Sequence, residues 1–273
     1  MLNRVLTALV LAPLALAVIW LMPTAGVAVL FGIVVMLGGA EWARLIGLVS
    51  TRSQLFFLIG LLLVLAFGWI FYRSALSNVP IVALAAAGWL LILYWLRRYS
   101  QLGGTPPPPP LVGALIGYLV LGLAWFSLVV LHGLEDGAYL VTLLLLVVWG
   151  ADTGAYVAGR SLGRHKLAPV ISPGKTREGA VGGLLLALLA GGLLHLALNP
   201  GEPSLPVLLP LLAVTVLFSI VGDLFESMIK RQHGAKDSGT LLPGHGGVLD
   251  RIDSLTAAAP IFVMGLLWWR MTP

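Results

Sequence analysis

Apolar stretches long enough to cross a lipid bilayer follow one another along almost the whole of this chain. A transmembrane helix needs about 20 apolar residues, and nine segments approach this length: 5–22, 24–40, 54–72, 79–96, 111–131, 138–158, 179–198, 205–229 and 252–269. Because a backbone in hydrocarbon must satisfy its own polar groups, each segment is expected to be a helix. The predicted fold is therefore all-α, a polytopic integral membrane protein with about nine transmembrane helices.

Composition excludes the common alternatives. Apolar residues make up 59% of the chain and charged residues 10%, whereas an ordinary globular domain carries about 25% charged residues. A soluble fold would expose too much apolar surface, and a disordered chain would be far more polar. Cysteine is absent, which excludes disulfides, thiolate metal sites and cysteine nucleophiles.

Basic residues indicate how the helices are oriented. If the N-terminus lies on the inner side, every Lys and Arg except Arg73 and Arg270 falls on that side. This pattern agrees with the positive-inside rule, so we expect an N-in/C-out topology. The first stretch could instead be a signal peptide, but its apolar run continues to Met22 and favours an uncleaved helix.

Acidic residues divide the chain into two parts. Before residue 150 the only acids are Glu41, Glu135 and Asp136, each near a predicted span end, and eight acids follow. All but one of these eight lie in, or next to, two large inner loops. We therefore expect a scaffold of about five helices, residues 1–137, and a region of about four helices and two cytoplasmic loops, residues 138–273, that carries the chemistry.

Several acids lie where a purely structural role explains them poorly. Asp152 falls in the sixth predicted span, about 9 Å short of its inner edge, where a carboxylate costs about 2.5–3.5 kcal/mol and needs a partner or a water-filled cleft. An ion pair with a loop arginine is the alternative. Asp223, Glu226 and Lys230 share one face of the eighth span. Glu226 and Lys230 could form an ordinary i, i+4 pair, which leaves Asp223 unexplained.

Asp250 and Asp253 stand three residues apart at the start of the ninth span. Helix capping explains one acid at such a position, but not two. Together with Asp223 they bring acids from two helix ends to the inner surface. An all-oxygen donor set favours Mg²⁺ over Zn²⁺, and Mg²⁺ in turn implies a phosphate-bearing ligand.

Two inner loops carry groups suited to phosphate. Residues 172–179 include Lys175 and Thr176 and lead into the seventh span, and such a helix N-terminus is an anion site. Attraction to anionic lipid headgroups is the alternative. Glycines at 244 and 246–247 would let backbone amides approach a phosphate. Between them, His245 could be a ligand, a general base or a hydrogen-bond donor.

Two further features concern packing. Residues 103–110 end in a run of prolines and are predicted to form a stiff spacer, with recognition by a proline-binding partner as the alternative. Gly179 and Gly183 would let another helix approach closely, either within the chain or in a homodimer.

Residues 227–253 resemble the signature of the phosphatidate cytidylyltransferases, the CDP-diacylglycerol synthases. The matching positions are Ser227, Lys230, Arg231, Lys236, Asp237, Pro243, His245, Gly246, Gly247, Asp250, Arg251 and Asp253. Residues 172–179 and the region of Asp152 also resemble the family, whereas the first half of the chain carries no signature.

The resemblance implies transfer of CMP from CTP to phosphatidic acid, giving CDP-diacylglycerol and pyrophosphate for phospholipid biosynthesis. It places the active site on the cytoplasmic side of a bacterial-type cytoplasmic membrane. It also implies Mg²⁺ held by Asp223, Asp250 and Asp253, and leaves a second cation open. Because a phosphate oxygen of the lipid attacks the α-phosphorus of CTP, no protein nucleophile is needed, and catalysis depends on positioning and charge stabilisation.

Site roles follow from the same resemblance. The expected catalytic residues are Asp223, Lys236, Asp237, His245, Asp250, Arg251 and Asp253. The expected phosphate-binding residues are Ser172, Lys175, Thr176, Lys230 and Arg231. Asp152, Glu178 and Glu226 are further candidates. The expected partners are CTP, phosphatidic acid and the bilayer, and no nucleic acid.

Two other functions compete with this one. An ion transporter could use Asp152 and Asp223 as an ion path, but transporters tend to show repeated halves, and the two halves of this chain differ. A related membrane transferase could use CTP on an isoprenoid substrate, and the first half of the chain does not exclude it.

Overall fold

The computed structural model describes residues 2–74, 77–198, 203–239 and 246–271, with side chains described from residue 12 to residue 270 within these ranges. These residues form nine helices and one two-stranded sheet. The helices are α1 (Leu2–Leu21), α2 (Thr24–Leu45), α3 (Thr51–Arg73), α4 (Val79–Gln101), α5 (Pro110–His132), α6 (Gly137–Leu162), α7 (Arg177–Leu198), α8 (Leu205–Gln232) and α9 (Leu249–Met271). Each of the nine predicted spans coincides with one helix, which confirms the all-α polytopic class.

Eight of the described helices, α2 to α9, are long and apolar enough to cross a membrane, and α1 has a shorter described apolar part, Ala12–Leu21. Most helices extend beyond the predicted spans. α2 runs to Leu45 rather than ending at residue 40, and α6 runs to Leu162 rather than 158. Backbone hydrogen bonding continues past the point where apolar residues give way to polar ones, so hydropathy alone places such ends too early.

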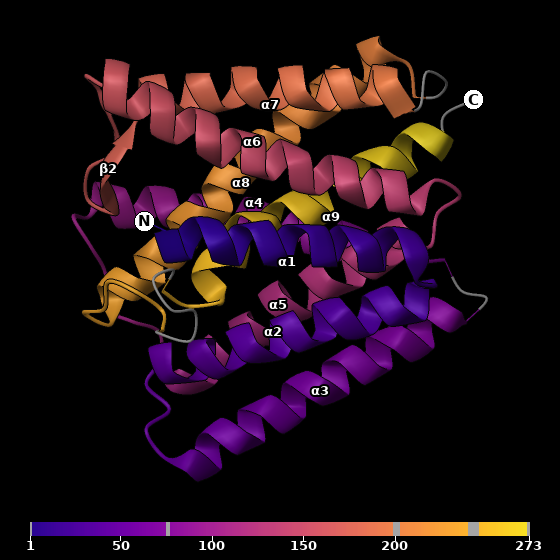
Figure 1. Ribbon diagram of the computed structural model, residues 1–273. Helices are drawn as coiled ribbons and strands as arrows, with labels where there is room; N and C mark the ends of the chain where they lie inside the picture. The colour runs from indigo at the N-terminus through magenta and orange to yellow at the C-terminus, as the bar shows by residue number, and fades with distance from the viewer. Residues whose placement is uncertain (1, 75–76, 199–202, 240–245, 272–273) are drawn as a thin grey trace.

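The helices run back and forth between two ends of the molecule, and the two termini lie at opposite ends (Figure 1). The connections α2–α3, α4–α5, α6–α7 and α8–α9 lie at the same end as the N-terminus, on the left of Figure 1. These are the connections predicted to be cytoplasmic, and the alternation agrees with an odd number of spans. The side of the membrane that this end faces stays a prediction.

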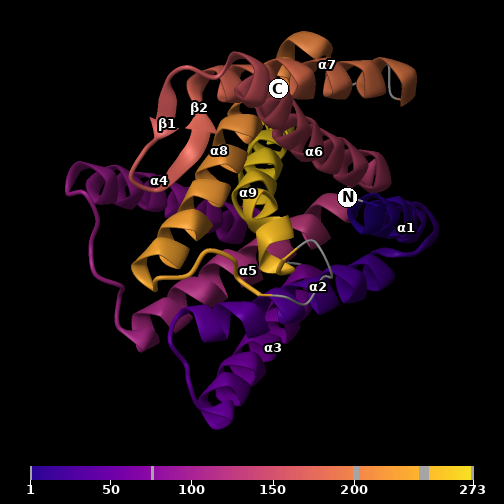
Figure 2. The ribbon, with the colours of Figure 1, turned by 60° about the vertical axis from the view of Figure 1, so that its left-hand side comes forward.

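Helix α9 occupies the centre of the bundle. It packs against α8, α5, α4, α2 and α6, and Figure 2 shows it between α8, α6 and α5. The small side chains Ala257, Ala258 and Ala259 are fully buried at its midpoint, so neighbouring helices approach closely. Large apolar side chains such as Phe67 on α3 and Leu189 on α7 are exposed, as expected of a surface that faces lipid. The two predicted parts of the chain are therefore packed together around α9.

Helices α6 and α7 pack against each other through glycine. A Cβ at Gly183 would lie 2.5 Å from the carbonyl oxygen of Ala151, and one at Gly154 would lie 2.6 Å from that of Gly182. A Cβ at Gly179 would likewise lie 2.9 Å from the carbonyl oxygen of Ala155. The small-residue face of α7 therefore packs within the chain, and the homodimer remains a hypothesis.

A short hairpin connects α6 to α7 and was not predicted. Strands β1 (Lys166–Ala168) and β2 (Ser172–Thr176) are antiparallel, with Lys166 paired to Thr176 and Ala168 to Ser172. The sequence indicated only a loop here, because strands of three and five residues that contain Pro173 and Gly174 give no period-2 pattern.

The proline-rich connector between α4 and α5 is fixed to the end of α8. Gln232 donates from Nε2 to Thr105 Oγ1 at 3.0 Å and to the carbonyl oxygen of Pro106 at 3.2 Å. The segment thus connects α4 and α5 while contacting the end of α8, as a stiff spacer would.

Candidate active site

A cavity of about 650 Å³ lies between α6, α7, α8, α9 and the hairpin, whose strands contribute Leu167 and Lys175 to its lining. Seven residues predicted from the sequence line it together: Asp152, Lys175, Thr176, Asp223, Asp250, Arg251 and Asp253. They come from four separate segments of the second half of the chain. Most of the acids that the sequence singled out therefore share one site.

A close crossing of α8 and α9 brings two of these segments together. A Cβ at Gly222 would collide with the carbonyl oxygen of Asp253 and lie 3.1 Å from the Cβ of Ala257. A glycine at this position lets the two helices approach, so Asp223 on α8 and Asp253 on α9 both reach the cavity. Asp253 Oδ1 also accepts a hydrogen bond from the Ser254 amide at 2.7 Å.

Asp223 forms an ion pair with Lys175 across the cavity. Lys175 lies on β2, and the two side chains are 26% and 27% exposed. Ser227, one turn further along α8, donates to Asp223 Oδ1 at 3.4 Å. The hairpin therefore places its lysine over the acidic side of α8.

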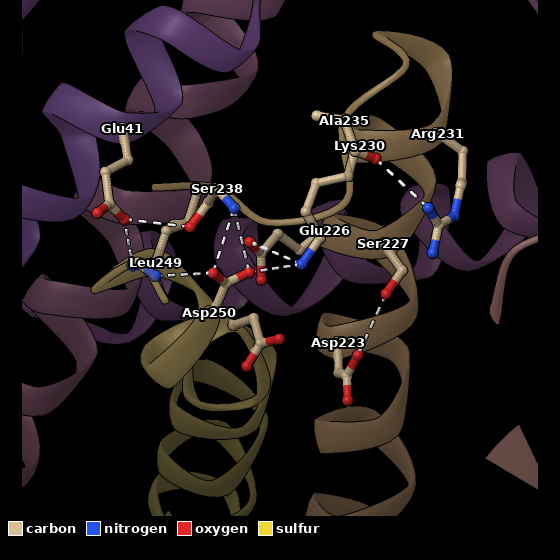
Figure 3. A network of polar contacts seen from close by, with 12 residues as sticks. Glu41, Asp223, Glu226, Ser227, Lys230, Arg231, Ala235, Ser238, Leu249 and Asp250 are labelled. Carbon is tan, nitrogen blue, oxygen red and sulfur yellow. Dashed lines mark hydrogen bonds and ion pairs between the residues drawn. The ribbon is translucent and has the colours of Figure 1, made fainter. Parts of the chain in front are cut away.

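A second lysine lies between the buried carboxylate of Glu226 and the partly buried carboxylate of Asp250. Lys230 Nζ is 2.6 Å from Asp250 Oδ1 and 3.3 Å from Glu226 Oε1 (Figure 3). The Lys230, Asp250 and Glu226 side chains are 10%, 12% and 3% exposed. Glu226 and Lys230 thus form the i, i+4 pair considered from the sequence, but the pair is buried and extends to a third charge on α9.

Backbone amides of the α8–α9 loop also hold Asp250. Its Oδ2 accepts hydrogen bonds from the Gly247 amide at 2.9 Å and from the Ser238 amide at 3.2 Å. Gly246 adopts φ +84°, a conformation that favours glycine. The described residues on the two sides of this loop therefore fix the orientation of the carboxylate.

The beginning of α7 is fixed by its own side chains. Thr176 Oγ1 accepts a hydrogen bond from the Gly179 amide at 3.1 Å, which is the usual N-terminal capping contact. Glu178 accepts from the Arg164 and His165 amides at 3.1 and 3.2 Å, and contacts His165 Nδ1 at 2.5 Å. Glu178 thus connects the hairpin to α7 and is not among the residues that line the cavity.

The other predicted residues that the structure describes are not among those that line the cavity. Arg231 donates to the carbonyl oxygens of Ile171 at 3.3 Å and Ala235 at 3.4 Å, so it connects the hairpin to the end of α8. Ser172 begins β2. Lys236 and Asp237 are exposed in the segment that follows α8. His245 lies outside the described residues.

Two lining residues of α6 were missed by the sequence analysis. Tyr156 and Arg160 line the cavity, and Arg160 Nη1 donates to Tyr156 Oη at 2.9 Å. They follow Asp152 at intervals of four residues, so all three lie on one face of α6. This spacing could have identified them once Asp152 was taken as a site residue.

Glu41 on α2 is a third residue that sequence reasoning missed. It is fully buried, and its Oε2 accepts hydrogen bonds from Ser238 Oγ at 3.1 Å and from the Leu249 amide at 2.8 Å. With the predicted span ending at residue 40, Glu41 seemed to lie at a helix end. In the structure it lies inside α2, where an ionisable residue is itself a functional signal.

The lining provides donors of the type that Mg²⁺ prefers. Asp152, Asp223, Asp250 and Asp253 supply carboxylate oxygens to one cavity. Within the described parts of the chain, however, no three or more His, Cys, Asp or Glu side chains are already arranged around an ion position. Asp223 and Asp250 are each paired with a lysine instead. The donor chemistry fits Mg²⁺, provided that these lysines move to other partners.

Comparison with known proteins identifies the family of the chain. Residues 2–268 match the family model described as the Cytidylyltransferase family. A phosphatidate cytidylyltransferase of Pseudomonas aeruginosa is 41% identical over 97% of this chain and 96% of its own length. Enzymes of the same name from Haemophilus influenzae and Brucella suis are 37% and 40% identical, over 95% and 96% of this chain and 96% and 92% of their own. These matches extend along nearly the whole chain, including the helices that carry no signature, and the chain therefore belongs to the cytidylyltransferase family.

Proposed function

We propose that this protein is a phosphatidate cytidylyltransferase, which joins the CMP of CTP to phosphatidic acid and releases pyrophosphate. The observation that carries the proposal is the cavity itself, where Asp152, Asp223, Asp250 and Asp253 face Arg160, Lys175 and Arg251 among membrane-spanning helices. The names of the relatives support the choice of substrates.

The composition of the cavity suits two phosphate-bearing substrates. Its cations come from α6, β2 and α9, so they surround a bound phosphate chain from several sides. Its walls belong to helices that lie in the bilayer, so a lipid phosphate can reach the same space while its acyl chains remain in hydrocarbon. A soluble nucleotide and a membrane lipid can therefore meet there.

The reaction requires positioning more than covalent chemistry from the protein. An oxygen of the phosphatidate phosphate attacks the α-phosphorus of CTP, a new P–O bond forms, and the bond to the β-phosphate breaks with release of pyrophosphate. Arg160, Lys175 and Arg251 stabilise the charge that develops on the phosphoryl oxygens. Asp223, Asp250 and Asp253 would hold Mg²⁺, which supplies further positive charge to the triphosphate.

The same proposal sets the orientation of the protein. CTP is a cytoplasmic nucleotide, so the end of the bundle that carries the hairpin and the cavity should face the cytoplasm. The N-in/C-out topology predicted from the basic residues places it there.

The deciding experiment uses the purified protein in detergent with Mg²⁺, CTP and phosphatidic acid, and measures pyrophosphate release. We expect release from the wild type and none from Asp250→Asn, which keeps the shape of the side chain but removes its charge. Asp136→Asn, an exposed acid at the opposite end of α6, is the matched control and should retain activity.

The assay tests the metal ligands, the substrate and the cofactor separately. Activity in Asp250→Asn would refute the metal assignment. Release with an isoprenoid alcohol or phosphate, but not with phosphatidic acid, would refute the substrate assignment in favour of a related CTP-dependent transferase. Release that does not depend on Mg²⁺ would refute the cofactor.

A further inference from the structure

Glu41 joins the first half of the chain to the loop that precedes α9. Its carboxylate lies in the interior, and its Oε2 accepts from Ser238 Oγ at 3.1 Å and from the Leu249 amide at 2.8 Å (Figure 3). Leu249 is the first residue of α9, so its amide has no intrahelical partner. Glu41 therefore caps α9 from another helix, 208 residues earlier in the sequence.

Two glycines of the loop close around this carboxylate. A Cβ at Gly239 would collide with Glu41 Oε1, and one at Gly247 would collide with both Ser238 Oγ and Glu41 Oε2. The backbone on both sides of the loop therefore lies against Glu41, at a distance that leaves no space for a side chain. The described ends of the loop therefore fit closely around the Glu41 carboxylate.

A short chain of hydrogen bonds leads from Glu41 to Asp250. Ser238 donates its hydroxyl to Glu41 and its amide to Asp250 Oδ2, and Gly247, which packs against Glu41, also donates its amide to Asp250. Movement of the Glu41 carboxylate would therefore move both amides that orient Asp250.

Packing of the adjacent residue, Trp42, fixes the position of Glu41 on helix α2. The adjacent Trp42 is 1% exposed, donates from Nε1 to the Gly113 carbonyl oxygen of α5 at 3.0 Å, and packs against Phe225 of α8 at 6.0 Å between ring centroids. Because α2 is held rigidly at this point, the Glu41 carboxylate can determine the position of the loop.

We propose that Glu41 is a positioning residue for the reaction: by holding Ser238 and the start of α9, it fixes the orientation of the Asp250 carboxylate in the cavity. This inference rests on the proposed function. A role in stability alone accounts less well for the arrangement, because Glu41 Oε1 is buried without a hydrogen-bond partner among the described residues. A buried acceptor left unpaired weakens the fold and calls for another explanation.

The test compares Glu41→Ala and Glu41→Gln with wild type. Mutation of a residue that orients a metal ligand through hydrogen bonds typically lowers activity or metal affinity by about 10- to 100-fold. We expect Glu41→Ala to lower kcat within that range, to raise the Mg²⁺ concentration needed for half-maximal thermal protection with a non-hydrolysable CTP analogue, and to leave the KM for phosphatidic acid unchanged. Glu41→Gln keeps an oxygen that accepts both hydrogen bonds and should restore most of the loss.

A double-mutant cycle with Ser238→Ala tests whether Glu41 acts on Asp250 through Ser238. If Glu41 acts partly through the Ser238 hydroxyl, Ser238→Ala lowers kcat and Mg²⁺ affinity alone but adds less in the Glu41→Ala background. Glu135→Ala, an exposed acid elsewhere in the same half of the chain, is the control and should behave as wild type.

Should Glu41→Ala fail to fold, Gly247→Ala carries the same test, because its methyl group pushes against Ser238 and Glu41. Gly88→Ala, where a Cβ meets no atom within 4 Å, is its control. Wild-type kcat and Mg²⁺ midpoint in folded Glu41→Ala, or in Gly247→Ala, would overturn the inference, as would fully independent effects in the cycle. A wild type with no CTP- and phosphatidate-dependent activity would instead overturn the proposed function.

Discussion

Replacement of Lys230 by methionine tests the buried charge cluster behind the cavity. The substitution keeps the approximate length and apolar stem of the side chain but removes the ammonium that contacts Asp250 at 2.6 Å and Glu226 at 3.3 Å. Two carboxylates that are 12% and 3% exposed then lose their shared cation.

The expected loss is large because Glu226 stays buried and Asp250 is only partly exposed. Removing one member of a buried ion pair costs about 3–5 kcal/mol, since an uncompensated charge remains in the interior. Asp250 keeps its bonds from the Gly247 and Ser238 amides, whereas both oxygens of Glu226 are buried without a hydrogen-bond partner among the residues that the structure describes. Most of the loss should therefore arise at Glu226, and the double variant Lys230→Met/Glu226→Gln should recover much of it.

The assay is thermal unfolding in detergent without ligands. At roughly 2 °C per kcal/mol for a chain of this size, Lys230→Met should lower Tm by about 6–10 °C. Lys166→Met, at an exposed lysine on β1, should change stability by no more than about 0.5 kcal/mol. The reasoning fails if Lys230→Met unfolds at the same temperature as Lys166→Met, or if adding Glu226→Gln lowers Tm further.

Three other predictions follow from the packing and the topology. Gly183→Ala places a methyl group against the Ala151 carbonyl oxygen and should destabilise the fold by about 1–3 kcal/mol. Gly192→Ala, where the nearest atom to a Cβ is 3.7 Å away, is the control and should not destabilise it. Equal Tm values for the two variants would refute glycine-mediated packing of α6 and α7. Thr176→Val removes the cap on the Gly179 amide and should cost about 1 kcal/mol, which Thr176→Ser restores; a valine variant as stable as wild type would contradict the cap. Because the chain has no cysteine, single cysteines at the exposed positions Gln101 and Glu135 can be labelled in intact cells with an impermeant maleimide. The N-in/C-out topology predicts labelling at position 135 and not at position 101. The opposite result would refute this topology.

The positions of the helices could be predicted because one physical requirement decides them. A segment in hydrocarbon must be apolar and helical, and both properties are local, so each predicted span coincides with a helix. The hairpin between α6 and α7 is held instead by pairing between β1 and β2 and by the contacts of Glu178 with Arg164 and His165. None of these contacts leaves a pattern in two short strands, the second of which contains Pro173 and Gly174.

The sequence predicted which acids line the cavity, but only some of the contacts that these acids make. Acids placed in or near apolar spans are costly, so Asp152, Asp223, Asp250 and Asp253 could be selected from the sequence, and all four line the cavity. Their partners could not be selected in the same way. Lys175 reaches Asp223 only because the hairpin folds over α8, and Lys230 reaches Asp250 only because α8 and α9 are adjacent. The metal ligands and the catalytic roles stay predictions.

The central position of α9 has a consequence for biogenesis. α9 is synthesised after α2, α4, α5 and α8, yet it contacts all four of them. Until it emerges from the ribosome, the earlier helices lack the element around which they pack, and Glu41 lacks its partner at the start of α9. The site therefore cannot assemble stepwise with the growing chain. It is complete only after α9 has entered the membrane, so a ribosome stalled ahead of α9 would leave helices that contact one another, such as α6 and α7, but no completed site.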